Sequence, residues 1–91
     1  MVNYKNQRRA YPRTPSHAIL EISHDAFGSI VLNAKDASAG GFFVLRGRHH
    51  LPPVNTLVRV IIRRYTGPLN SDPVLMRVAH VSDEGMGLAF V

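Results

Sequence analysis

The feature that most restricts the fold of this sequence is a series of short runs in which apolar and polar residues alternate. Such alternation places apolar side chains on one face of a β-strand, and no run shows the 3.6-residue period of a long helix. Between the runs stand clusters of glycine, proline, aspartate and serine, which favour turns. The pattern predicts about six strands, at residues 18–23, 30–34, 42–45, 57–65, 74–81 and 87–91.

The length of the chain limits how these strands can be arranged. A chain of 91 residues forms one small domain, and an open sheet would leave hydrophobic strand edges exposed. We therefore expect an all-β fold, a six-stranded antiparallel β-barrel over residues 16–91 without a clear C-terminal helix. Residues 1–15 contain two prolines and show neither the two-residue period of a strand nor the 3.6-residue period of a helix. We therefore expect them to form a flexible N-terminal arm.

The composition limits the cellular compartments and the classes of binding partner that we expect for this protein. The sequence has no cysteine, no apolar run long enough to span a membrane and no signal peptide, so we expect a cytoplasmic protein. Its net charge is +5, and nine of its eleven cationic side chains are arginines. Guanidinium groups bind phosphate and the guanine edge with two parallel hydrogen bonds. The balance of charge therefore predicts an anionic partner, either a nucleotide or a nucleic acid.

Catalysis and metal binding find little support in the sequence. No nucleophile elbow, phosphate-binding loop or zinc-protease motif is present, and the carboxylates are scattered through probable turns and strand faces. The histidines show no metal-ligand spacing. They are His17, His24, His49, His50 and His80. We expect neither an enzyme nor a metal site.

Two motifs stand out from this background. Arg9 and Arg13 have the spacing Arg-x-x-x-Arg, with Arg8 directly before them. This spacing is weak evidence alone, because Arg59 and Arg63 repeat it within a predicted strand, where both should lie on one solvent-exposed face. An ordinary basic tail would also account for the first pair.

The second motif is Asp36-x-Ser38-x-x-Gly41, which interrupts the alternation with small residues. It predicts a turn or bulge between two strands, in which aspartate and serine bond to nearby backbone and glycine supplies a positive φ. That interpretation explains the residue types. It leaves the presence of the arginine motif upstream unexplained.

Together, the segments Arg9-Ala10-Tyr11-Pro12-Arg13, Asp36-Ala37-Ser38-Ala39-Gly40-Gly41 and Gly85-Met86-Gly87-Leu88-Ala89-Phe90 resemble those of a PilZ domain, over residues 7–91. The resemblance implies a six-stranded β-barrel that binds the bacterial second messenger cyclic di-GMP. It also implies that the arginine motif folds over the ligand and that the second motif lies on the barrel surface. The implied ligand-binding residues are Arg8, Arg9, Arg13, Asp36, Ser38 and Gly41.

The chemistry of these residues suits such a ligand. Arginine can bind both its phosphates and guanine O6 and N7, and Asp36 can accept hydrogen bonds from guanine N1 and N2. Ser38 can add a hydrogen bond, and Gly41 would let backbone approach the ligand without a Cβ. In the family an arginine at the position of Arg8 goes with two intercalated ligand molecules, so we expect two per chain and no metal.

Two functions from different classes follow. The first is a cyclic di-GMP receptor whose arm is disordered alone, closes over the ligand and signals to an unidentified partner protein. The alternative is a small basic barrel that binds single-stranded nucleic acid, with Phe42 or Phe43 stacking on bases. These adjacent side chains point in opposite directions along a strand, so one of them could be exposed.

Overall fold

The computed structural model describes residues 14–64, 67–68 and 72–91. In these residues every regular element is a β-strand, so the predicted all-β fold class is confirmed. No helix that could cross a membrane is found among them. The strands are β1 (Thr14–Pro15), β2 (Ile19–His24), β3 (Gly28–Ser38), β4 (Gly41–Leu45), β5 (Leu57–Arg64), β6 (Gly67–Pro68), β7 (Val74–Val81) and β8 (Gly85–Phe90).

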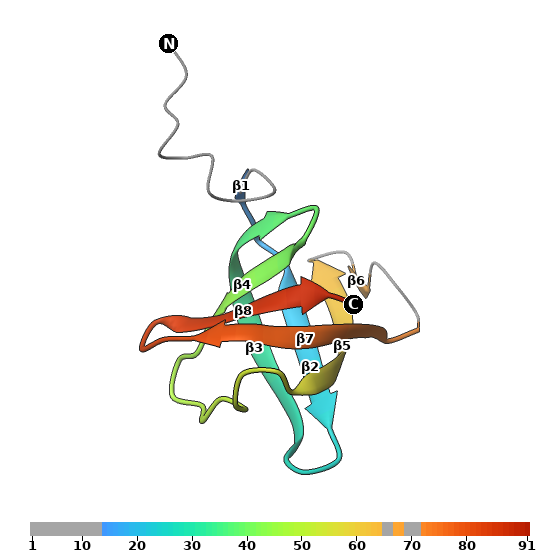
Figure 1. Cartoon of the computed structure of the whole chain (residues 1–91). Helices are drawn as coiled ribbons and strands as arrows, with labels where there is room; N and C mark the ends of the chain where they lie inside the picture. Colours follow the sequence, from blue (N-terminus) through green and yellow to red (C-terminus); the bar gives the residue numbers. More distant parts are fainter. Residues whose placement is uncertain (1–13, 65–66, 69–71) are drawn as a thin grey trace.

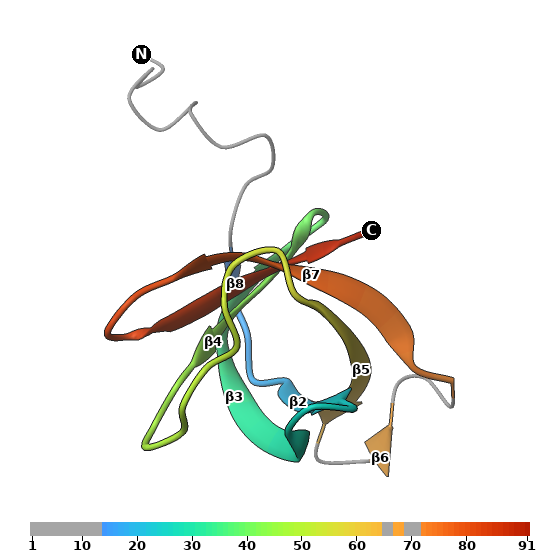
Figure 2. The ribbon, with the colours of Figure 1, turned by 60° about the horizontal axis from the view of Figure 1, so that its bottom comes forward.

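Six of these strands close into an antiparallel barrel. They pair in the order β3, β2, β5, β7, β8 and β4, and β4 pairs again with β3. In Figure 2 the strands curve around a common interior. The short strands β1 and β6 pair with β3 and β5 respectively. The six-stranded antiparallel barrel predicted from the sequence is therefore confirmed.

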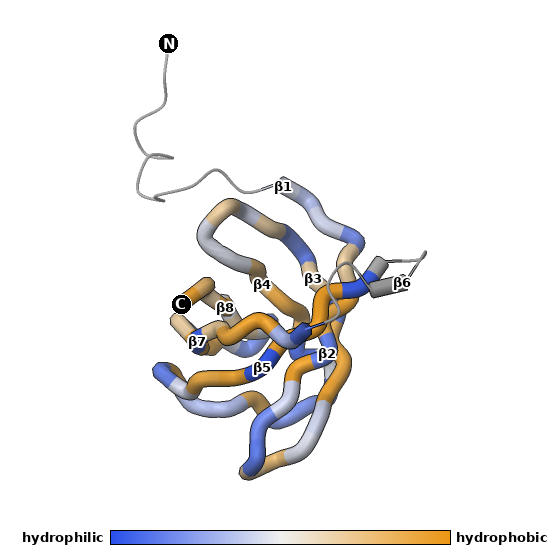
Figure 3. The backbone as a smooth tube through the Cα atoms, turned by 90° about the vertical axis from the view of Figure 1, so that its right-hand side faces the viewer, coloured by the Kyte–Doolittle hydropathy of each residue, from blue (hydrophilic) through white to orange (hydrophobic). Residues whose placement is uncertain are grey.

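Alternating apolar side chains fill the barrel. Figure 3 shows hydrophobic stretches along the barrel strands that are interrupted by hydrophilic residues; along β5, for example, the exposed Arg59 lies between the buried Val58 and Val60. Inward-facing residues on every barrel strand are almost completely buried. They include Leu20, Ile22, Leu32, Ala34, Val44, Val58, Val60, Met76, Val78, Met86 and Leu88. Burial of this apolar surface is the main source of stability in a chain without disulfides.

The strand boundaries differ from the sequence prediction mainly at β3. Residues 30–34 were expected to form a strand that ends before the motif at residues 36–41. The strand instead runs from Gly28 to Ser38, and only Ala39 and Gly40 form the turn into β4. Asp36 and Ser38 are thus strand residues. Asp36 pairs with Pro15 of β1 and with Phe43 of β4, whereas Ser38 pairs with Gly41 of β4.

The two ends of the barrel carry different connections. At one end lie β1 and the hairpin between β3 and β4, at the top of Figure 1, and the pairing of Gly41 with Ala89 brings the end of β8 to this hairpin. At the other end lie the hairpin between β2 and β3, the hairpin between β7 and β8, and the connection over residues 46–56. The predicted motif therefore belongs to the end at which the described chain begins.

Candidate functional site

A β-bulge in β3 determines where the side chains of Asp36 and Ser38 point. Ala34 is only 6% exposed, and strict alternation would place Asp36 inside the barrel with it. The register shifts between Ala34 and Asp36, which leaves Lys35 as an extra residue. Asp36 and Ser38 therefore both lie on the outer face, half-buried. The predicted bulge is present, and it turns the polar side chains of the motif away from the core.

The hairpin that follows explains the serine and the glycine of the motif. Ser38 Oγ accepts a hydrogen bond of 3.1 Å from the backbone N–H of Gly40, so the turn interpretation of this side chain is confirmed. Gly41 has φ +154°, and a Cβ there would lie 1.8 Å from the carbonyl oxygen of Leu88. The missing side chain thus allows β4 to approach β8. A ligand contact at the Gly41 backbone stays a prediction.

The N-terminal segment enters the barrel beside this motif. In β1, Thr14 pairs with Ala37 and Pro15 pairs with Asp36. Thr14 Oγ1 also donates a hydrogen bond of 3.4 Å to the carbonyl oxygen of Ala37. Arg13 is covalently bonded to Thr14, so the chain leaves the described barrel next to the motif. The predicted site residues Arg8, Arg9 and Arg13 lie outside the described residues, as does most of the predicted arm.

A second bulge, in β7, brings a histidine onto the same face. The register shifts between Val78 and His80, so His80 points outward although strict alternation would place it inside. The His80 ring occupies the space above Gly87, where a Cβ would lie 2.3 Å from Cε1 of the ring. It stacks on Phe43, with ring centroids 5.7 Å apart and an angle of 22° between the planes. Sequence analysis missed this pair because alternation does not reveal a bulge.

The two phenylalanines do not offer the exposed ring that nucleic-acid binding was expected to use. Phe43 faces outward but is only 7% exposed. Phe42 packs against the core and makes an edge-to-face contact with Phe90 at 6.1 Å. The expectation that one of them is freely exposed is therefore wrong. The physical reason is that the His80 ring covers the outward-facing ring.

We call the outer surface of β3, β4, β8 and β7 near this hairpin the motif face. Pairing places its residues in two adjacent rows across the four strands. One row contains Asp36, Phe43, Gly87 and His80, and the other contains Ser38, Gly41, Ala89 and Arg77. A carboxylate, a hydroxyl, stacked rings and a guanidinium thus share one surface.

A small pocket lies beside the motif face, where the chain passes from β1 to β2 along β3. Its volume is about 260 Å³, slightly less than that of pockets that enclose drug-sized ligands. Ser16, His17 and Asn33 provide polar groups at its rim.

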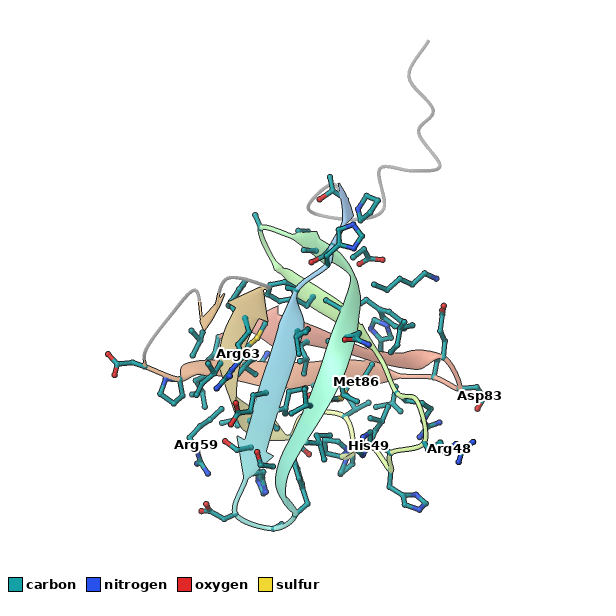
Figure 4. The ribbon with its side chains drawn as sticks, turned by 180° about the vertical axis from the view of Figure 1, so that it is seen from behind. Arg48, His49, Arg59, Arg63, Asp83 and Met86 are labelled. Atoms are coloured by element: carbon teal, nitrogen blue, oxygen red, sulfur yellow. The ribbon has the colours of Figure 1, made fainter. Side chains whose placement is uncertain are left out.

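The side of the barrel opposite the motif face carries Arg59 and Arg63, which have the same spacing as Arg9 and Arg13. Arg59 Nη2 lies 2.9 Å from Asp25 Oδ1, and Arg63 Nη2 lies 2.9 Å from Glu21 Oε1. We call these four residues the ion-paired face. Figure 4, a view from behind, shows both arginines on the same side of the barrel. The prediction that they lie on one solvent-exposed face is confirmed, and each has a carboxylate partner within the chain.

The described part of the chain contains no cluster of side chains that could bind a metal ion. No group of three or more histidine, cysteine, aspartate or glutamate side chains is placed to hold an ion there. The side chains that the motif face brings together can act through hydrogen bonds, charge and stacking.

Comparison with protein families agrees with this arrangement. The family model of the PilZ domain matches residues 7–91, nearly the whole chain, so the chain belongs to the PilZ domain family. This family binds cyclic di-GMP and is a family of binding domains, not of catalytic ones. A separate comparison, with curated proteins, found no match to the chain.

Proposed function

We propose that this chain is a receptor for cyclic di-GMP that binds the nucleotide on the motif face. The observation that carries this proposal is the bulge in β3, which directs Asp36 and Ser38 outward beside the point where the arginine motif joins the barrel. Family membership supplies the ligand class. The ligand-binding residues of the proposal are Arg8, Arg9, Arg13, Asp36, Ser38 and Gly41.

The proposed recognition uses complementary groups at each part of the ligand. The arginines of residues 8–13 bind the phosphates and the O6 and N7 acceptors of guanine. Asp36 accepts hydrogen bonds from guanine N1 and N2. Adenine lacks both O6 and the N2 amine, so cyclic di-AMP would leave these groups without partners. Selectivity for guanine follows from that difference.

The proposed signal is a change in the arm. Residues 7–13 would fold over the bound nucleotide, at a free-energy cost that is offset by contacts made only in the complex. Two intercalated ligand molecules per chain fit the arginine at position 8. A partner protein in the bacterial cytoplasm would then bind the altered surface.

Backbone NMR mapping with cyclic di-GMP tests the location of this site. We expect the amide signals of Thr14, Ala37 and Ser38 to shift on titration, because they surround the junction of arm and motif. The signals of Arg59 and Arg63, on the ion-paired face, should stay in place and serve as the internal control. Shifts confined to the ion-paired face would refute the location.

A further inference from the structure

Most cationic side chains of the described barrel have partners within the chain. Arg59 and Arg63 form the two ion pairs described above, and Lys35 Nζ lies 2.6 Å from Glu84 Oε2. Arg46 donates a hydrogen bond of 3.3 Å to the carbonyl oxygen of Ser82. These contacts occupy part of the hydrogen-bonding capacity of each cation, and they neutralise three of the four charges.

Two arginines differ from this pattern. Arg48 and Arg77 are exposed, and neither has an ion-pair or hydrogen-bond partner for its side chain among the residues that the structure describes. They lie in different parts of the barrel. Arg48 belongs to the connection after β4, at the end opposite the motif, and is labelled in Figure 4. Arg77 belongs to β7.

Strand pairing places Arg77 on the motif face. Its neighbours Met76 and Val78 are fully buried, so Arg77 points outward. It pairs with Ala89, which pairs with Gly41, which pairs with Ser38. Three steps between neighbouring strands correspond to about 14 Å along the sheet.

Nothing bulky separates Arg77 from the motif along this row. Gly41 has no side chain and Ala89 has only a methyl group. In the adjacent row, His80 lies flat enough over Gly87 to stack on Phe43. A ligand of two nucleotides that is held at Asp36 and Ser38 can therefore extend over β4 and β8 toward the guanidinium of Arg77.

We infer that Arg77 is a further ligand-binding residue, which contacts cyclic di-GMP on the side of the motif face away from the arm. The inference rests on the proposed function. Its guanidinium would form two parallel hydrogen bonds to acceptor oxygens or nitrogens of the ligand, either at a phosphate or at the O6 and N7 edge of guanine. Arg77 would thus hold the part of the ligand that Asp36 and Ser38 do not reach.

Matched arginine variants test this inference by calorimetric titration at fixed salt. We expect Arg77→Ala to weaken binding of cyclic di-GMP about tenfold. Arg48→Ala removes the same charge from another exposed arginine without a described partner, and it should change the dissociation constant less than about twofold. Both variants should melt at nearly the temperature of the unmodified chain, since neither side chain is buried.

The outcomes separate this inference from the proposed function. If Arg77→Ala binds as tightly as the unmodified chain while Asp36→Ala loses binding, Arg77 is not a ligand contact and the proposed function stands. Equal weakening by Arg77→Ala and Arg48→Ala would show only an effect of general positive charge, and it would also overturn the inference. If the unmodified chain does not bind cyclic di-GMP, the proposed function fails first and the role of Arg77 fails with it.

Discussion

The two faces of the barrel use arginine in different ways. On the ion-paired face, Arg59 and Arg63 are held by Asp25 and Glu21 of the same chain. On the motif face, Arg77 has no such partner among the described residues and shares a surface with an acidic and a hydroxyl side chain. The spacing Arg-x-x-x-Arg is therefore no evidence of a ligand site by itself. The carboxylates around each arginine decide whether it remains available.

The same contrast extends to the backbone. The motif face is built by two bulges and by a close approach of β4 to β8, whereas β2 pairs with β5 in an unbroken register. Irregular pairing turns Asp36 and His80 outward, and regular pairing keeps alternate residues inside. The predictions below test this difference, beginning with the largest expected effect.

Gly41→Ala should destabilise the fold most. The added Cβ would meet the Leu88 carbonyl oxygen at 1.8 Å, and backbone must move to relieve the clash. We expect a loss of about 3 kcal/mol in the free energy of unfolding, measured by chemical denaturation. Gly28→Ala is the control, because Gly28 also has a positive φ, +83°, but no atom lies within 4 Å of the added Cβ. It should cost about 1 kcal/mol. Equal losses would show that backbone conformation alone matters at both glycines.

Asp36→Ala should have the largest effect on binding with little effect on folding. Removal of the carboxylate leaves guanine N1 and N2 without an acceptor, so the dissociation constant for cyclic di-GMP should rise between about tenfold and a hundredfold. Arg13→Ala should act in the same range, through loss of a bidentate contact. Titration calorimetry measures both. Unchanged affinity in both variants would remove the motif face from the binding site.

His80→Ala tests the stacked rings of the motif face. Loss of the imidazole exposes the Phe43 ring, which is now 7% exposed, and removes a stacking contact. The free energy of unfolding should fall by about 1 kcal/mol. Thermal or chemical denaturation measures the change. A variant as stable as the unmodified chain would show that the stacked pair contributes nothing to the barrel itself.

Arg63→Ala should have the smallest effect, on the ion-paired face. The Arg63 and Glu21 side chains are 48% and 34% exposed, so solvent screens their attraction. We expect a loss of at most about 0.5 kcal/mol in the free energy of unfolding and no change in affinity for cyclic di-GMP. A loss of affinity equal to that of Arg13→Ala would abolish the distinction between the two faces.

The alternation of apolar and polar residues predicted well those strands that pair without a bulge. The strands expected at residues 18–23 and 57–65 are observed as β2 and β5, to within one residue at each end, and they pair with each other without a bulge. The short strands β1 and β6 were missed, because two residues that include a proline carry no period. The last strand begins at Gly85 rather than at residue 87, since glycines contribute nothing to a hydrophobic pattern.

The candidate site was harder to derive. Asp36, Ser38 and Gly41 were found by their motif, yet alternation would have pointed Asp36 into the core. Arg77 and His80 were not proposed at all. They join the motif face only through pairing of β7 with β8 and of β8 with β4, which are contacts between distant parts of the chain. Local sequence patterns contain no information on such neighbours.

Titration with cyclic di-GMP and, at the same salt concentration, with cyclic di-AMP tests the central claim most directly. The two ligands carry the same phosphates, so a surface that binds only by positive charge would bind both equally. We expect saturable binding of cyclic di-GMP, with two molecules per chain, and no comparable binding of cyclic di-AMP. Equal affinity for the two nucleotides, or no binding of cyclic di-GMP, would contradict the account.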